Sequence, residues 1–86
     1  MFYTYILHSS KSNKFYIGAC QNIPSRLQRH NAGATPSTKN GRPWCVVYSE
    51  AFNTKNEALA REKHIKSMKS KIYIQKLINN AATNKE

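Results

Sequence analysis

The first eighteen residues carry the hydrophobic pattern of a β-hairpin. Aromatic and β-branched side chains predict a strand at Phe2 to Leu7, and a polar turn at Ser9 to Asn13 separates it from a second strand at Lys14 to Gly18. Two such runs joined by a short turn favour antiparallel pairing. Alternation divides the first strand between two faces, with Tyr3, Tyr5 and Leu7 on one and Phe2, Thr4 and Ile6 on the other.

A helix is predicted after the hairpin, with recognisable signals at both of its ends. Asn22 can accept backbone N–H bonds at a helix start, where Pro24 is tolerated because its missing donor is not needed there. The helix extends to about Asn31, and Gly33 offers a left-handed stop. Pro and Gly punctuate residues 34–43, which are predicted to form a loop.

The stretch from Trp44 to Ser49 predicts a third strand. It is apolar on both faces, which favours the central or best-covered position in the sheet. Thr54 and Glu57 then have the spacing of a capping box, which predicts a helix that begins there and runs to about Met68.

A last helix is predicted at Ser70 to Asn79, where apolar residues recur at helical spacing, although Ile72 to Ile74 would also suit a strand. Residues 79–86 are expected to form a frayed tail. The order β-β-α-β-α-α indicates an α+β fold, in which a small three-stranded sheet is flanked by about three helices. The chain length allows a single domain, assigned to residues 1–78.

The charge of the chain points to its partner rather than to its fold. Its 86 residues include 14 Lys and Arg against four acids, all of them glutamate, which gives a formal charge of +10 and a pI near 10.0. This balance favours nucleic acid as partner, although small proteins can also be basic without one. Four carboxylates, one of them at the last residue, are too few for the ligand cage of a two-metal nuclease or phosphatase.

The two cysteines, Cys20 and Cys45, offer neither a disulfide framework nor the ligand spacing of a zinc site. They are expected to be reduced thiols in a cytoplasmic protein. No apolar run approaches the about 20 residues that span a bilayer, and the first residues lack the basic leader of a secretory signal.

One glutamate of the second predicted helix lies on its apolar face. At about 100° per residue, Glu62 falls about 40° from Ala58, inside the stripe that also holds Ile65. It is either a metal ligand at the edge of the core or the partner of Lys66 in a surface ion pair. The other acids have other positions: Glu57 in the cap, Glu86 in the tail, and Glu50 after a strand without an evident partner.

Two basic and two phenolic residues add further candidate chemistry. Arg26 and His30 lie side by side on the first helix and suit a phosphate, because a guanidinium binds its oxygens and an imidazole can move a proton. The alternative is a solvated face that binds DNA without chemistry. Tyr5 and Tyr16 come from paired strands, and their hydroxyls either meet or belong to packing residues.

An ordered set of motifs covers the chain to about residue 78. Its segments are Tyr3–Leu7, Phe15–Gly18, Arg26–Gly33, Thr38–Pro43, Val46–Tyr48, Glu57–Glu62 and Ile65–Lys66. Tyr5 and Tyr16 are eleven positions apart, and Arg26 follows Tyr16 by ten. This set resembles the GIY-YIG nuclease family, and more closely its small stand-alone bacterial UPF0213 members. The first motif departs from the family pattern, because Tyr3-Thr4-Tyr5 stands where Gly-Ile-Tyr is usual.

The resemblance implies a GIY-YIG-like antiparallel sheet and cleavage of DNA phosphodiester bonds with Mg²⁺ or Mn²⁺. The implied catalytic residues are Tyr5, Tyr16, Arg26, His30 and Glu62, with Glu62 also the metal ligand. Tyr16 would orient or deprotonate the attacking water, Tyr5 would support it by hydrogen bonding, and Arg26 would stabilise the phosphate in the transition state. His30 would assist proton transfer or contact the phosphate. The residues expected to contact nucleic acid are Arg29, Lys39, Arg42 and Lys66.

The expected activity is that of a metal-dependent DNA endonuclease with low sequence specificity, because phosphate contacts carry no sequence information. Branched or single-stranded DNA is among the expected substrates, and DNA repair or processing is the expected setting. Two alternatives stay open. One is a nucleic-acid-binding module without chemistry, and the other is a nuclease subunit that a protein partner targets to its substrate.

Overall fold

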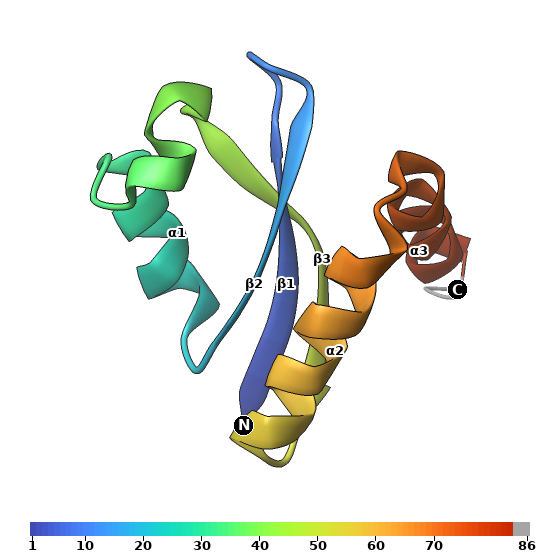
Figure 1. The fold of residues 1–86 in the computed structure, drawn as a ribbon. Helices are drawn as coiled ribbons and strands as arrows, with labels where there is room; N and C mark the ends of the chain where they lie inside the picture. Colours follow the sequence, from blue (N-terminus) through green and yellow to red (C-terminus); the bar gives the residue numbers. More distant parts are fainter. Residues whose placement is uncertain (84–86) are drawn as a thin grey trace.

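The chain folds into a three-stranded antiparallel sheet with helices on both faces (Figure 1). The computed structural model describes residues 1–83. The elements follow the predicted order, with one added 3₁₀ helix: β1 Phe2–Ser9, β2 Lys14–Cys20, α1 Ile23–Asn31, η1 Pro36–Gly41, β3 Trp44–Phe52, α2 Lys55–Met68 and α3 Lys71–Thr83. Within this part of the chain, no helix is long and apolar enough to cross a membrane.

The predicted hairpin is confirmed. β1 and β2 pair antiparallel, with Tyr5 opposite Gly18 and Leu7 opposite Tyr16. Asn13 in the turn has a φ of 55°, a left-handed conformation that asparagine adopts more readily than most residues. The register leaves the two candidate catalytic tyrosines on neighbouring strands, two positions apart along the ladder.

The predicted position of the third strand is wrong. The strand order is β2-β1-β3, so β3 lies at an edge of the sheet and β1 is central. The four residues from Thr4 to Leu7 of β1 are all buried, whereas Cys45, Ser49 and Ala51 of β3 are exposed. The apolar run in β3 shows that this strand is hydrophobic, but it does not determine the position of the strand in the sheet. Which strand is central depends on pairing, and β1 is bonded on both of its edges.

Two hydrophobic clusters form on opposite faces of the sheet. They consist of Ile6, Ile17, Ile65 and Ile74 on one face, and of Tyr5, Leu7 and Trp44 on the other. Helices α2 and α3 supply Ile65 and Ile74 to the first cluster, whereas α1 packs Ile23 and Leu27 against the second. The predicted alternation of the first strand is therefore confirmed, and it directs the candidate catalytic tyrosines to the face that α1 covers.

The predicted helix caps are present. Asn22 Oδ1 accepts the Ser25 N–H at 2.9 Å, and Gly33 follows α1 with a φ of 81°. In α2 the Glu57 N–H donates to Thr54 Oγ1 at 3.2 Å, while the Thr54 N–H donates to Glu57 Oε1 at 3.1 Å. A cap of this kind stabilises a helix by about 1 kcal/mol. This reciprocal capping box fixes the residue at which α2 begins.

Several predicted boundaries differ from the structure. The three strands end at Ser9, Cys20 and Phe52, two or three residues beyond their predicted ends. Within the predicted loop, residues 36–41 form η1, which begins at Pro36, where the fixed φ of proline suits a first helical residue. Helix α3 runs to Thr83, so residues 79–83 of the predicted tail are helical. The remainder of that tail, residues 84–86, lies outside the described residues.

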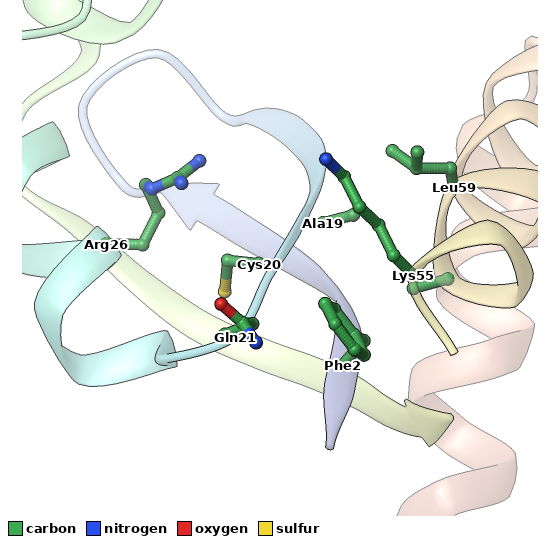
Figure 2. A pocket seen from close by; sticks show the side chains of 8 residues that line it. Phe2, Ala19, Cys20, Gln21, Arg26, Lys55 and Leu59 are labelled. Carbon is green, nitrogen blue, oxygen red and sulfur yellow. The ribbon is translucent and has the colours of Figure 1, made fainter. Parts of the chain in front are cut away.

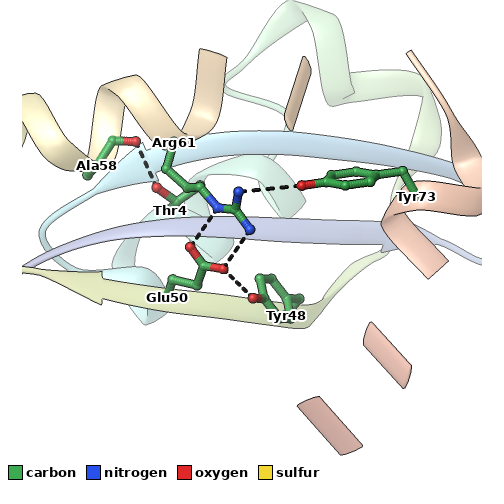
Figure 3. Close-up of polar contacts among 6 residues, drawn as sticks. All are labelled: Thr4, Tyr48, Glu50, Ala58, Arg61 and Tyr73. Carbon is green, nitrogen blue, oxygen red and sulfur yellow. Dashed lines mark hydrogen bonds and ion pairs between the residues drawn. The ribbon is translucent and has the colours of Figure 1, made fainter. Parts of the chain in front are cut away.

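A polar cluster, which we call the Glu50 clamp, ties β3 to α2 and α3 (Figure 3). Arg61 donates to both oxygens of Glu50, from Nε at 2.9 Å and from Nη2 at 3.1 Å, and from Nη1 to the Tyr73 hydroxyl at 3.4 Å. The Tyr48 hydroxyl also donates to Glu50. Burial alone would raise the pKa of Glu50, but the hydrogen bonds from Arg61 and Tyr48 outweigh it and keep that pKa below its usual value. Glu50, for which the sequence suggested no partner, is therefore a structural residue.

Candidate active site

A buried chain of hydrogen bonds joins β1 to α1 and η1. The Tyr5 hydroxyl lies 3.1 Å from His30 Nε2, and His30 Nδ1 lies 2.8 Å from Thr38 Oγ1. Thr38 Oγ1 in turn donates to the Thr35 carbonyl at 3.3 Å. The side chains of Tyr5, His30 and Thr38 are each only 1% exposed. Burying these polar groups would be costly without partners, and the chain of hydrogen bonds provides a partner for each of them.

The direction of these hydrogen bonds favours one tautomer of His30. The Thr38 hydroxyl has a single proton, which it gives to the Thr35 carbonyl, so its oxygen accepts from His30 Nδ1–H. The lone pair of His30 then lies on Nε2, which accepts from the Tyr5 hydroxyl. The chain therefore holds His30 as a neutral imidazole in one orientation.

Burial keeps both Tyr5 and His30 uncharged at neutral pH. It raises the pKa of the Tyr5 phenol, and Tyr16 raises it further, although the charge of Arg26 opposes both effects. Burial also lowers the pKa of His30, and the positive charges of Arg26 and Arg29 lower it further. At neutral pH the hydrogen bond between them therefore joins a neutral phenol to a neutral imidazole.

Tyr16 and Arg26 are the half-buried members of the group. The Tyr16 ring centroid lies 4.8 Å from that of His30 and 6.4 Å from that of Tyr5. Among the described residues, every buried side-chain polar atom has a partner, and the Tyr16 hydroxyl bonds to none of them. It is therefore open to solvent, unlike the hydroxyl of Tyr5. The charge of Arg26 acts on both Tyr5 and His30. It opposes the rise in the pKa of Tyr5 and adds to the fall in the pKa of His30.

Gly18 makes room for the Tyr5 hydroxyl. A Cβ at this position would lie 2.5 Å from the Tyr5 oxygen and 2.6 Å from its Cζ, closer than real Cβ atoms approach. Any side chain there would displace the Tyr5 ring from its place beside His30. Gly18 stands in the Tyr-Ile-Gly motif, so the close approach gives a physical reason for a glycine at this position.

Glu62 lies apart from this group. It is on α2, which packs on the opposite face of the sheet from α1, and its Oε2 forms a 2.6 Å ion pair with Lys66 Nζ. The surface-pair alternative is thus the arrangement that the structure contains, although the Glu62 side chain is only 20% exposed. Four of the five predicted catalytic residues come together, and no contact joins Glu62 to them within the described part of the chain.

A cavity of about 210 Å³ lies between α1 and the start of α2, beside the end of β2 (Figure 2). Arg26 lines it from α1, and Lys55 and Leu59 line it from α2. Glu62 follows Leu59 by three residues, one turn further along the helix. The cavity therefore extends from Arg26 on α1 towards the helix that carries Glu62.

The basic residues predicted to contact nucleic acid have three different environments. Lys39 and Arg42 line a second cavity together with Lys11. Arg29 is exposed on α1, whereas Lys66 is occupied by its ion pair. Of the described side chains that line the second cavity, none is acidic, so its charge suits an anion such as phosphate.

Replacing Thr38 by valine is expected to lower the free energy of unfolding by about 1–3 kcal/mol, because it leaves the buried His30 Nδ1–H without an acceptor. Thr38→Ser keeps a hydroxyl and should lose less. Chemical unfolding measures the difference, and ¹⁵N NMR of the imidazole reports its tautomer. Ser37→Ala, at an exposed position of η1, is the matched control. Wild-type stability and an unchanged imidazole spectrum in the valine variant would contradict the hydrogen-bonded chain.

Comparisons with known proteins agree with this fold and motif order. The GIY-YIG catalytic domain family matches residues 1–78. UPF0213 proteins of Staphylococcus haemolyticus and Staphylococcus saprophyticus are each 42% identical over 66 residues, which cover 76% of this chain and 79% of the relative. The solution NMR structure of a UPF0213 protein from Bacillus halodurans is similar at a TM-score of 0.56 and 30% identity, over 92% of this chain and 84% of that chain.

Proposed function

Because the chain belongs to the GIY-YIG catalytic domain family, which implies a nuclease-type function, we propose that it is a metal-dependent endonuclease that hydrolyses DNA phosphodiester bonds with low sequence specificity. The observation that carries this proposal is the convergence of four side chains from two strands and one helix. They are Tyr5, Tyr16, Arg26 and His30. One cation, one solvent-accessible phenol and one fixed imidazole are groups that phosphodiester hydrolysis can use.

Arg26 is proposed to bind the phosphate that reacts. Its guanidinium lines the cavity beside the group, and a planar fork of donors suits two phosphate oxygens at once. Negative charge builds up on the phosphate in the transition state, so a positioned cation stabilises that state more than the ground state.

Tyr16 is proposed to orient the attacking water. Its hydroxyl is open to solvent, whereas the hydroxyl of Tyr5 is already bonded to His30. Tyr5 and His30 then support the site through their fixed, neutral hydrogen bond. The packing of the Tyr16 ring beside the His30 imidazole, with centroids 4.8 Å apart, favours a defined direction for the Tyr16 hydroxyl.

The donor groups suit a Mg²⁺ or Mn²⁺ ion held through a single carboxylate. Residues 1–83 contain no group of three His, Cys, Asp or Glu side chains that could hold a metal by themselves. Mg²⁺ commonly keeps several waters and uses one or two carboxylates together with substrate phosphates. Glu62 would be the protein ligand, once it is released from Lys66. When bound, the ion would supply Lewis-acid chemistry and neutralise charge on the phosphate.

The net charge of +10 supports binding to the DNA backbone, with Lys39, Arg42 and Arg29 as proposed contacts. Backbone contacts give affinity without reading bases, so the preference is for DNA structure rather than sequence. Lys66 would join these contacts when its ion pair opens. DNA repair or processing is the proposed setting, because enzymes in such pathways act on structures.

Cleavage assays with branched, single-stranded and plasmid DNA test the proposed function. We expect strand breaks in Mg²⁺ or Mn²⁺ and none in EDTA. Removing the metal should leave DNA binding intact, and that binding should weaken steeply as salt rises. Binding of all three DNAs without cleavage in either metal would contradict an endonuclease and favour a nucleic-acid-binding module.

A nuclease subunit that depends on a protein partner is the second candidate, and the ion pair between Glu62 and Lys66 favours it. The pair occupies Oε2 of the proposed metal ligand at 2.6 Å, so a metal ion can use that oxygen only after Lys66 moves. A partner or its DNA could drive that movement. Cleavage that appears only after cell extract is added, and that still requires Glu62, would support this candidate.

A further inference from the structure

The cavity in Figure 2 contains side chains for which the proposed chemistry has no role. Arg26 forms one wall, but Phe2 of β1, Gln21 after β2, and Lys55 and Leu59 of α2 also line it. It therefore combines two cations with an aromatic ring, an aliphatic side chain and an amide. Among the described residues that line the cavity, none is acidic.

Two of its apolar side chains contribute little to the core. Phe2 and Leu59 belong to neither of the two core clusters that the described residues form, and Leu59 is 44% exposed. Proteins that bind single strands combine cations along the backbone with aromatic rings on which bases stack. Phe2 and Leu59 offer such an apolar surface next to Arg26.

Lys55 occupies a position at which helix energetics favour an acid. It is the first residue of α2, where the helix dipole makes a positive charge unfavourable. Figure 2 shows its side chain extending from the helix across the cavity towards Ala19 on β2. Lys55 thus adds a second cation to the lining of the cavity, and its charge and that of Arg26 both favour a bound anion.

The size of the cavity limits what it can bind. Its volume of about 210 Å³ is below the about 300–1,000 Å³ of pockets for drug-sized ligands. One base or one phosphate group matches that volume better than a stacked base pair does. A purely phosphate-binding site would not need the apolar walls, whereas a nucleotide has both an anion and a flat apolar face.

We propose that this cavity is a subsite for one nucleotide with an unpaired base, adjacent to the phosphate that Arg26 binds. This inference rests on the proposed nuclease function, because Arg26 belongs to both sites. The base lies against Phe2 and Leu59, and Lys55 contacts the next phosphate of the same strand. A base can enter only when it is not held in a continuous duplex, so the subsite selects single-stranded or branched DNA.

Binding without metal tests the subsite separately from cleavage. A duplex with one unpaired 2-aminopurine and its fully paired counterpart are titrated with the protein in EDTA. We expect about 5- to 10-fold tighter binding of the unpaired form, with a change in 2-aminopurine emission that Phe2→Leu removes. Lys55→Met should reduce the preference to less than about 2-fold. Lys76→Met, at an exposed position of α3, removes the same charge and should keep the preference.

The outcomes separate the subsite from the nuclease. Equal binding of the two duplexes by the wild type would overturn the subsite, even if DNA is cleaved in Mg²⁺. A preference for the unpaired form in a protein that never cleaves DNA would support the subsite and reject the endonuclease. If Phe2→Leu fails to fold by circular dichroism, Lys55→Met decides, and an undiminished preference in that variant would overturn the proposal.

Discussion

Glu62→Gln is expected to reduce Mg²⁺-dependent DNA cleavage by about 10³-fold while the protein stays folded. Glutamine keeps the size of the side chain but removes the charge that a metal ion requires. Within the described residues, no group of ligating side chains can take over that role. Cleavage rates at several Mg²⁺ concentrations measure the loss, and thermal unfolding checks the fold. Cleavage that persists unchanged would remove the proposed metal role of Glu62.

Lys66→Met is the matched control for this variant, because it breaks the same ion pair and keeps the carboxylate. If Glu62 binds the metal, freeing it from Lys66 should lower the Mg²⁺ concentration needed for half-maximal cleavage by a factor of about 2–5. The two variants then move metal dependence in opposite directions. If both lose cleavage equally while each binds DNA as tightly as the wild type does, the ion pair itself matters and Glu62 is not the ligand.

Tyr16→Phe is expected to reduce cleavage by about 10²- to 10³-fold at an almost unchanged melting temperature. Its hydroxyl bonds to no other described residue, so removing it leaves no buried group without a partner. The ring remains to pack beside His30. Cleavage and melting measured on the same preparation test this, and an unfolded variant would mean that the hydroxyl is structural.

Tyr5→Phe provides the contrast, because it removes a tyrosine hydroxyl from β1, the strand next to the one that carries Tyr16. There the loss leaves His30 Nε2 buried without its donor, which should lower the free energy of unfolding by about 1–3 kcal/mol. The two variants thus distinguish a hydroxyl that supports the fold from one proposed to meet the substrate. Equal stability of the two would contradict the assignment of the buried donor to Tyr5.

Most of the candidate site could be predicted from the sequence because it depends on local geometry. Alternation along β1 and the hairpin turn bring Tyr5 and Tyr16 to one face, and a four-residue spacing brings Arg26 beside His30 on α1. Each relation spans one element or one tight connection. The capping box of Thr54 and Glu57 could be predicted for the same reason, since its two bonds form within one helical turn.

The relations that could not be predicted join separate elements. Thr38 reaches His30 only because residues 36–41 form η1, and no periodicity in the sequence indicates that contact. Strand order could not be predicted either, because the hydrophobicity of β3 does not determine which neighbours it pairs with. The sequence indicates a special role for Lys55 only weakly, because it places a basic residue directly after the helix cap Thr54.

The Glu50 clamp could not be predicted for a related reason, since its members come from a strand and two helices. Tyr48 and Glu50 are two residues apart on β3 and so share a face, which was a usable signal. Arg61 follows Glu50 by eleven residues, across a connection and the start of α2. Nothing in the sequence indicates how far around its axis that helix is turned when it reaches the sheet.

The Glu50 clamp fixes the rotation of α2 about its own axis. Successive residues of a helix point about 100° apart, so a guanidinium held by both oxygens of Glu50 also sets the direction of the next side chain, that of Glu62. A roll of α2 about its own axis would swing that carboxylate along an arc. The direction of the Glu62 carboxylate, the proposed metal ligand, is thus set by the ion pair between Arg61 and Glu50, which does not need to contact the substrate.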